Sequence, residues 1–171
     1  CIICRQRRVI MFRTMGKLDH VDLALLTALA EEPRATVVAL AETLGLSRNT
    51  VQARMAKLER AGVFLSFERT IASGALGFPL QAAVSVHVRQ TELPRISQEL
   101  TEIPEVIQAY GLSGPVDLLV HVACRGAHHL FDVDARILSI EGVERTETSL
   151  VMNEVIPYRM RPLMALARQE S

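Results

Sequence analysis

The stretch SRNTVQARMAKLER, residues 47–60, carries side chains that suit contact with a nucleic acid. Arginine reads a guanine edge with two hydrogen bonds, asparagine and glutamine read adenine, and lysine neutralises phosphate. A small side chain lets a helix lie close to the floor of a groove. The candidate DNA-contact residues are Arg48, Asn49, Thr50, Gln52, Ala53, Arg54, Lys57 and Arg60.

The cations and the amides in this set have different predicted roles. All four cations are expected to contact phosphate, whereas Asn49, Gln52 and also Arg48 are expected to read base edges. Arg54 has an alternative role, which is to support the helix from its flank. The substitution Lys57→Ala is expected to weaken binding to every sequence and to lower its salt dependence by about one phosphate contact.

Three predicted helices position these residues. Apolar residues recur at helical spacing in residues 18–32, and a second helical pattern follows in residues 36–44. Gly45 ends the second helix, and Ser47 caps the third after a turn of two residues. Two short helices joined by a tight turn that contains glycine are typical of a helix-turn-helix.

The third helix has two different faces. Val51, Met55 and Leu58 share an apolar face that must pack on the first two helices, which turns the polar residues outward. A polar, basic face on an isolated helix is usually only solvated. The complete three-helix pattern and the local charge favour DNA instead. Residues 62–72 are predicted to leave this module as a strand.

The net charge is zero, but the charge is unevenly distributed. Residues 1–70 hold 11 basic and 7 acidic side chains, and the remainder hold 8 and 12. Between Arg34 and Arg60 there are five basic and two acidic residues. An excess of positive charge in one half suggests that this half meets a polyanion.

The C-terminal two-thirds contain a repeat. The tripeptide VHV occurs at Val86–Val88 and again at Val120–Val122, each time at the end of a β-type run. A helical segment follows each copy, then a break (IPEV or IEGV), then another strand. Two βαβ units in succession give βαββαβ, the ferredoxin-like arrangement.

Alternation along these strands separates two faces of the predicted sheet. Val84, Val86, Val88 and their counterparts in the second copy are expected to face the helices. The other face is too apolar to be simply solvated, so we expect it to be buried against a second subunit. Its residues are Ala83, Ser85, His87, Leu119, His121 and Ala123.

The repeat places His87 and His121 at equivalent positions, and neighbouring strands would bring the two imidazoles close together. They are expected either to be hydrogen-bonded histidines of an interface or to form a pH-sensitive contact or a metal site. The segment LSGPVDL, residues 112–118, is either an ordinary turn or part of a ligand site.

These residues resemble the Lrp/AsnC, or feast/famine, family of transcription regulators. The resemblance covers residues 17–156 and rests on LDHVDLALLTAL, LAETLGLSRNTVQARMAKLERAGVF, GLSGPVDLLV and IEGVERTETSLV. It implies an α+β fold, with a winged helix-turn-helix domain followed by a ferredoxin-like domain that binds an effector and dimerises. It also implies homodimers, often assembled into octamers that wrap DNA, and an amino acid bound between neighbouring dimers.

The family's effector motif G-x-x-D corresponds to Gly114 and Asp117. The effector-site residues that the resemblance implies are Ser113, Gly114, Val116, Asp117, Thr146, Thr148 and Ser149. The chain departs from the family at Val116, where an aromatic residue is common, and at Pro115, which stiffens the loop. A specificity for leucine or asparagine is therefore not carried over.

The domain boundaries expected from these patterns are as follows. Residues 1–14 form an extension, expected to be disordered, before a natural start at Met15; residues 15–64 form the helix-turn-helix domain, 65–79 a linker strand and hinge, 80–156 the ferredoxin-like domain and 157–171 a tail. Leu163, Met164 and Leu166 recur at helical spacing in that tail, which either caps the sheet or joins an oligomer contact.

The remaining composition points to a cytoplasmic protein. No apolar run approaches a membrane span of roughly 18 residues. Cys1 and Cys4 lack a second pair that would complete a zinc site, and Cys124 is expected to be a small buried hydrophobe. We expect no metal, no cofactor other than an amino-acid effector, and no enzymatic activity, because no catalytic motif occurs.

The sequence thus predicts a sequence-specific transcription regulator controlled by an amino acid or a related effector. One alternative is an architectural protein that wraps DNA with weak sequence preference. Another is a metabolic sensor that does not bind DNA. A regulator should prefer its site over random duplex by roughly 10³ or more.

Overall fold

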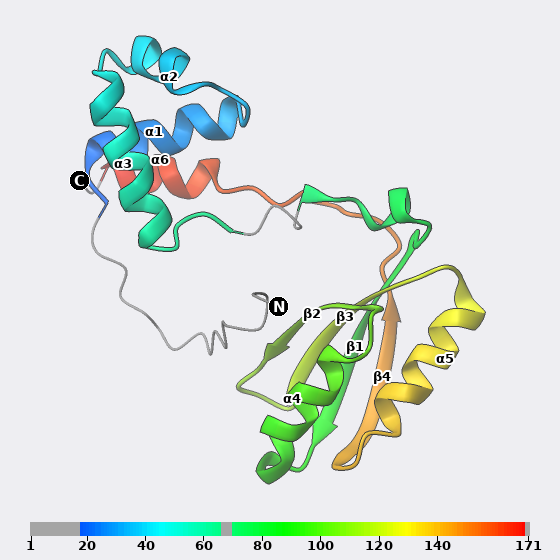
Figure 1. The fold of residues 1–171 in the computed structure, drawn as a ribbon. Helices are drawn as coiled ribbons and strands as arrows, with labels where there is room; N and C mark the ends of the chain where they lie inside the picture. Colours follow the sequence, from blue (N-terminus) through cyan, green and yellow to red (C-terminus); the bar gives the residue numbers. More distant parts are fainter. Residues whose placement is uncertain (1–17, 66–69, 170–171) are drawn as a thin grey trace. The chain divides into compact units, whose positions relative to one another are not determined.

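The computed structural model describes residues 18–65 and 70–169. The described residues form two compact units (Figure 1). The first contains the residues up to Leu65 together with those from Tyr158 onward, and the second contains Thr70–Pro157. The expectations for Cys1, Cys4 and the start at Met15 lie outside the described residues.

The first unit is helical, with α1 (His20–Glu31), α2 (Val37–Leu44), α3 (Arg48–Arg60) and α6 (Arg161–Gln169). Each of the first three helices begins at a polar cap whose side chain accepts a hydrogen bond from a backbone amide three residues on: Asp19, Thr36 and Ser47. Gly45 has φ 64°, a left-handed conformation that ends α2 and allows the tight turn into α3.

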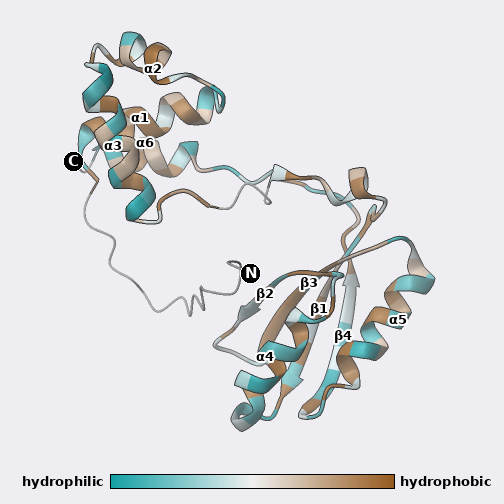
Figure 2. Cartoon of the chain, in the orientation of Figure 1, coloured by the Kyte–Doolittle hydropathy of each residue, from teal (hydrophilic) through white to brown (hydrophobic). Residues whose placement is uncertain are grey.

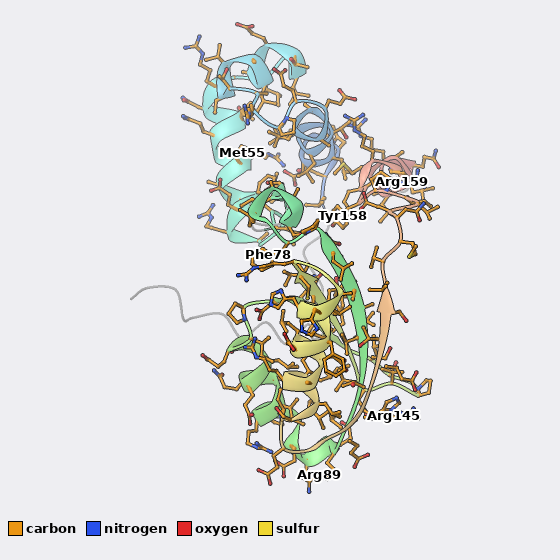
Figure 3. All side chains as sticks on the ribbon, turned by 90° about the vertical axis from the view of Figure 1, so that its right-hand side faces the viewer. Met55, Phe78, Arg89, Arg145, Tyr158 and Arg159 are labelled. Carbon is orange, nitrogen blue, oxygen red and sulfur yellow. The ribbon has the colours of Figure 1, made fainter. Side chains whose placement is uncertain are left out.

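The core of this unit is formed by the apolar faces of the helices. Val51 and Leu58 of α3 are fully buried, and Met55 packs against the same cluster (Figure 3). Their partners on α1 and α2 are Leu25, Leu26, Leu40 and Ala41. The predicted assignment of Val51, Met55 and Leu58 to the packing face is confirmed.

The second unit is a four-stranded antiparallel sheet with two helices on one face (Figure 1). Its elements are β1 (Leu80–Val88), α4 (Leu93–Thr101), β2 (Val106–Gly111), β3 (Leu118–Cys124), α5 (Ala127–Leu138) and β4 (Val143–Leu150). The strand order β2-β3-β1-β4 is that of the predicted ferredoxin-like fold. Two short 3₁₀ helices, η2 (Ser73–Leu76) and η3 (Gln90–Glu92), flank β1.

Alternation along β1 and β3 builds the core of this unit. Val84 and Val86 of β1 and Val120 and Val122 of β3 are fully buried under α4 and α5, and these strands are largely hydrophobic (Figure 2). Cys124 is also fully buried, as predicted. Burial raises the pKa of its thiol, which disfavours the reactive thiolate.

Some predicted elements differ from the structure. The described parts of the predicted strand 62–72 contain no strand, and residues 66–69 lie outside the described range. The last strand, β4, ends at Leu150, which pairs with Ala82, and the Val151 amide donates a hydrogen bond to the Gln81 carbonyl just beyond this pair. The C-terminal segment forms α6, which packs on α1 rather than on the sheet.

No helix within the described ranges is long and apolar enough to cross a membrane.

Candidate nucleic-acid interface and effector loop

The outer face of α3 is a row of exposed polar and small side chains. Asn49, Ala53, Ala56 and Arg60 follow one another at intervals of three or four residues, so they lie along one side of the helix. Arg48 and Gln52 are exposed beside this row. The structure therefore brings together most of the predicted DNA-contact residues on a single accessible surface, which we call the α3 outer face.

Thr50 lies at the start of α3 and takes part in its cap. The Ser47 hydroxyl accepts a hydrogen bond from the Thr50 amide at 3.1 Å and lies 2.8 Å from the Thr50 hydroxyl. Thr50 is half-buried in this arrangement. Its hydroxyl stabilises the first turn of the helix, and only its remaining hydrogen-bonding capacity is available to a ligand.

Arg54 and Lys57 are held in ion pairs with the beginning of α1. The Arg54 guanidinium contacts Asp19 and lies 3.0 Å from Asp22 Oδ1, while Lys57 Nζ lies 2.6 Å from Asp22 Oδ2. Asp22 is completely buried. We call Asp19, Asp22, Arg54 and Lys57 the α1–α3 ion-pair cluster.

Two of the four cations for which phosphate contacts are expected thus have carboxylate partners within the chain. The ion pairs of Arg54 are those that its alternative role, support of the helix from its flank, would require, and the Lys57 ammonium is also paired. Arg48 and Arg60 form no ion pair with any residue in the described part of the chain. The Arg60 Nε donates to the Ala56 carbonyl at 3.1 Å, which lays its side chain along the α3 outer face.

The ion-pair cluster shifts the pKa values of both carboxyl groups. Hydrogen bonds from Arg54 and from the Asp22 amide lower the pKa of Asp19 to about 2. Burial alone would raise the pKa of Asp22, but hydrogen bonds from Lys57 and Arg54 outweigh it and lower that pKa. Both groups are ionised at neutral pH, so the attachment of α3 to α1 is electrostatic as well as apolar.

The loop between β2 and β3 contains the first four predicted effector residues. Ser113 and Gly114 are exposed, and Val116 and Asp117 are half-buried. Both oxygens of the Asp117 carboxylate have partners: one accepts from the Val88 amide at 2.9 Å, and the other accepts from the Gln90 side-chain amide. Asp117 therefore attaches the loop to the end of β1.

The other three predicted effector residues lie on β4 and point to opposite sides of the sheet. Thr146 and Thr148 face α5, where their hydroxyls donate to Asp134 at 3.2 and 2.7 Å. Ser149 pairs with Ala83 on the open side of the sheet. The seven residues thus have three different surroundings within one protomer and do not form one enclosed site.

The open face of the sheet carries the residues that we expected to meet a second subunit. Ala83, Ser85, Leu119 and His121 are half-buried, consistent with a surface covered only in part by its own chain. Ala123 is the exception, because it is already buried within the protomer.

The expected proximity of His87 and His121 is wrong. The strands β1 and β3 are neighbours, but their antiparallel register pairs His121 with Ala83, four residues from His87. At about 3.3 Å per residue this offset is roughly 13 Å. His87 contacts Arg145 at 3.0 Å, and His121 lies edge-on to Tyr110. No cluster suited to a metal ion occurs among the described residues.

Sequence reasoning missed two carboxylates that organise this chain. Neither Asp22 nor Asp134 was assigned a role from the sequence. The signal for Asp22 was a matched spacing: Asp19 and Asp22 are three residues apart, as are Arg54 and Lys57. The pairing of Asp134 with Thr146 and Thr148 depends on how α5 crosses β4, and no local pattern encodes it.

Each of the two units matches a known domain family. Residues 18–59 match the family profile of the AsnC-type helix-turn-helix domain, and residues 81–160 match that of the Lrp/AsnC ligand binding domain. The chain is 32% identical over 149 residues to the HTH-type transcriptional regulator Rv2324 of Mycobacterium tuberculosis, covering 86% of this chain and all of that protein. It is also 32% identical to the HTH-type transcriptional regulator AldR of Mycolicibacterium smegmatis, over 81% of this chain and 83% of that protein.

Solved structures show the same fold. The structure of Escherichia coli AsnC superposes with a TM-score of 0.76 at 25% identity, covering 85% of this chain and 99% of that one. The complex of the transcriptional regulator NMB0573 of Neisseria meningitidis with L-Met superposes with a TM-score of 0.73 at 26% identity, over 85% and 99%. With both domain profiles matched in order along one chain, this protein belongs to the Lrp/AsnC family of helix-turn-helix transcription regulators.

Proposed function

We propose that the α3 outer face binds the major groove of duplex DNA. Arg48 and Arg60 contact phosphates, Asn49 and Gln52 read base edges, and Ala53 allows close approach. The observation that carries this proposal is the exposure of all five side chains on one side of a helix whose opposite side is anchored in the core by the buried Val51 and Leu58. Thr50 adds a contact at the start of the helix.

Arg54 and Lys57 serve the same interface indirectly. Their ion pairs to Asp19 and Asp22 fix the rotation of α3 about its own axis relative to α1. A recognition helix that turns about its axis presents different side chains to the groove, so this attachment supports base recognition. Lys57 keeps about half of its side chain exposed (49%), which places its charge near the edge of the interface.

We further propose that the protein acts as a homodimer or as a larger assembly of dimers. Support comes from the half-buried, weakly polar open face of the sheet. A two-fold dimer would carry two recognition helices, which suits a DNA site made of two related half-sites about one helical turn apart.

We propose that an amino acid or a related small molecule controls the binding of DNA. The matched ligand-binding profile spans both the β2–β3 loop and β4, and a relative has been crystallised with L-Met. Ser113, Gly114 and Val116 are the accessible part of the loop, and Ser149 is an exposed hydroxyl on the open side of β4. Because these groups do not enclose a site in one protomer, a neighbouring subunit would complete it.

The decisive experiment is a selection of bound sequences from a random DNA library, run with and without a mixture of amino acids that includes methionine. We expect an enriched motif with two related halves, whose recovery changes when the mixture is present. A motif that does not respond to the mixture would count against control by these amino acids. Retention of DNA without any enriched motif would favour an architectural, DNA-wrapping protein.

The variant Asn49→Ala provides the residue-level check. We expect it to relax the selected motif at one or two positions, because an asparagine at a base edge contributes about 1–3 kcal/mol of discrimination. Glu42→Ala, an exposed position on α2, is the matched control and should select the wild-type motif. An unchanged motif for Asn49→Ala would remove this residue from the set of base readers.

A further inference from the structure

We propose that α6 is a C-terminal latch of the DNA-binding unit: it docks on α1 of its own chain and gives this unit a second covalent connection to the effector domain. This inference rests on the proposed function, because it assigns the latch a role in DNA binding. The helix lies outside both matched family profiles, which end at residues 59 and 160.

Three side-chain contacts define the docking. The Arg161 guanidinium donates to the Ala30 carbonyl at 2.8 Å, the Thr27 hydroxyl lies 4.0 Å from the Met164 sulfur, and the Arg168 guanidinium donates to the Leu23 carbonyl at 3.2 Å. As the residue number rises along α6, that of its partner falls along α1. The two helices are therefore antiparallel neighbours.

An apolar contact supports the polar ones. Met164 packs against the core cluster of the helical unit, whereas Leu163 and Leu166 on the other side of α6 are each 56% exposed. A helix of nine residues is not stable alone in water, since isolated helices shorter than about 12–15 residues are marginal. The helical state of α6 thus depends on its contact with α1.

Arg161 also supplies a charge that α1 lacks. The last carbonyl groups of a helix have no partner within it, and cations near this end are stabilising. The last turn of α1 has no basic residue and ends at Glu31. Arg161 brings a guanidinium to the Ala30 carbonyl in that turn, so it caps α1 from a distant part of the sequence.

The path of the chain explains why the docking of α6 would restrict the motion of the DNA-binding unit. The chain leaves the helical unit after Leu65, completes the whole sheet, and re-enters the helical unit at Tyr158. A domain held by two connections samples fewer orientations than a domain held by one, which lowers the entropic cost of placing two recognition helices on one duplex. At its other end α1 holds α3 through the ion-pair cluster.

Docking is tested by crosslinking. Thr27→Cys and Met164→Cys are combined in a chain with Cys1→Ser and Cys4→Ser, and the protein is treated with a short bifunctional thiol reagent. We expect a crosslink within one chain, seen by mass spectrometry of the denatured monomer. If the double cysteine variant forms no more crosslink within one chain than either single cysteine variant, the proposal is overturned. A covalent dimer would overturn it equally, because α6 would then dock on another chain.

The role in DNA binding is tested with Met164→Asp, and Leu163→Asp is its matched control on the exposed side of α6. We expect Met164→Asp to accelerate hydrogen exchange in α1 and to weaken binding to a duplex with two half-sites by about tenfold. Binding to a single half-site should change little. Leu163→Asp should leave exchange and affinity unchanged.

The possible results distinguish a failure of the latch proposal from a failure of the proposed function. Unchanged exchange and affinity in Met164→Asp would overturn the latch, and equal losses on both duplexes would overturn its role as a tether. If the wild-type protein selects no DNA, the proposed function fails, and the docking of α6 is still decided by the crosslink and by hydrogen exchange.

Discussion

At the scale of single residues, the four cations of α3 show that positive charge alone does not identify a candidate DNA contact. Arg48, Arg54, Lys57 and Arg60 are indistinguishable as cations in the sequence. In the structure Arg54 and Lys57 pair with carboxylates of α1, while Arg48 and Arg60 remain on the α3 outer face. The partners of each cation in the structure therefore distinguish the candidates for DNA contact from the side chains that hold α3 on α1.

The first residue-scale prediction compares Arg48→Ala with Lys57→Ala. Loss of one phosphate contact lowers the slope of log K against log salt by about 0.9, and we expect this change for Arg48→Ala. Lys57→Ala should lower the slope less, because its ammonium is already paired with Asp22. The measurement is affinity for one duplex at four salt concentrations. Equal reductions would show that Lys57 contacts phosphate as fully as Arg48.

The second residue-scale prediction concerns Asp22→Asn. Removing the buried charge from two ion pairs should lower the free energy of unfolding by about 2 kcal/mol at pH 7. Folding lowers the pKa of Asp22, so this stabilisation is complete above the unfolded pKa of about 4 and is lost as the pH falls through the lower folded pKa.

We therefore expect the difference in Tm between wild type and Asp22→Asn to be large at pH 7 and to shrink steadily below pH 4. Thermal unfolding followed by circular dichroism measures it. Asp132→Asn, at an exposed position on α5, is the control and should show a small difference at every pH. A difference for Asp22→Asn that shows no decrease as the pH is lowered below 4 would exclude the electrostatic explanation.

At the scale of elements, the sequence predicts most of the fold. The apolar periodicity, the caps at Thr36 and Ser47 and the glycine at 45 locate α2 and α3, since these signals are local. The repeated VHV locates β1 and β3 and predicts which face α4 and α5 cover. In each case the deciding interaction lies within a few residues or within a repeated unit.

Elements that depend on distant contacts are not predictable in this way. The helical spacing of Leu163, Met164 and Leu166 predicts a helix but not the surface on which it packs, and α1 is more than 130 residues away. The separation of His87 from His121 follows from the register of β1 against β3, which no pattern within either strand specifies. The division of the effector residues on β4 is different, because alternation along a strand already places the neighbours Thr148 and Ser149 on opposite faces.

The element-scale prediction tests the close approach of α3 to DNA. Ala53→Leu preserves helix propensity but adds three carbon atoms to the α3 outer face. We expect DNA affinity to fall at least about tenfold, roughly 1.4 kcal/mol, with Tm unchanged. Ala135→Leu, at an exposed position on α5, is the matched control and should retain wild-type affinity. Normal binding by Ala53→Leu would mean that this part of α3 does not enter the groove.

At the scale of the whole molecule, the open face of the sheet is the surface through which we expect two subunits to associate. Ser85 lies near the centre of that face, opposite Leu119 of β3 and Glu147 of β4. The face carries few charges along β1 and β3 and is only half-buried by its own chain. A second copy of the same surface would cover it, as expected for a two-fold dimer.

The corresponding prediction is that Ser85→Arg gives monomers at micromolar concentration, because a long charged side chain at the centre of this face would prevent a second copy from packing closely against it. Light scattering coupled to gel filtration measures the mass. Gln98→Arg, at an exposed position on α4, adds the same charge elsewhere and should keep the wild-type mass. An assembly that survives Ser85→Arg would place the subunit contact on another surface.

The docking of α6 on α1 has a consequence for how the protein is made. Translation runs from the N-terminus, so α1, α2 and α3 leave the ribosome long before α6, which completes their unit. The DNA-binding unit therefore cannot be complete until the whole sheet and α6 have been synthesised. A stop codon between β4 and α6 would leave every residue of α1, α2 and α3 in place and still damage the unit that they form.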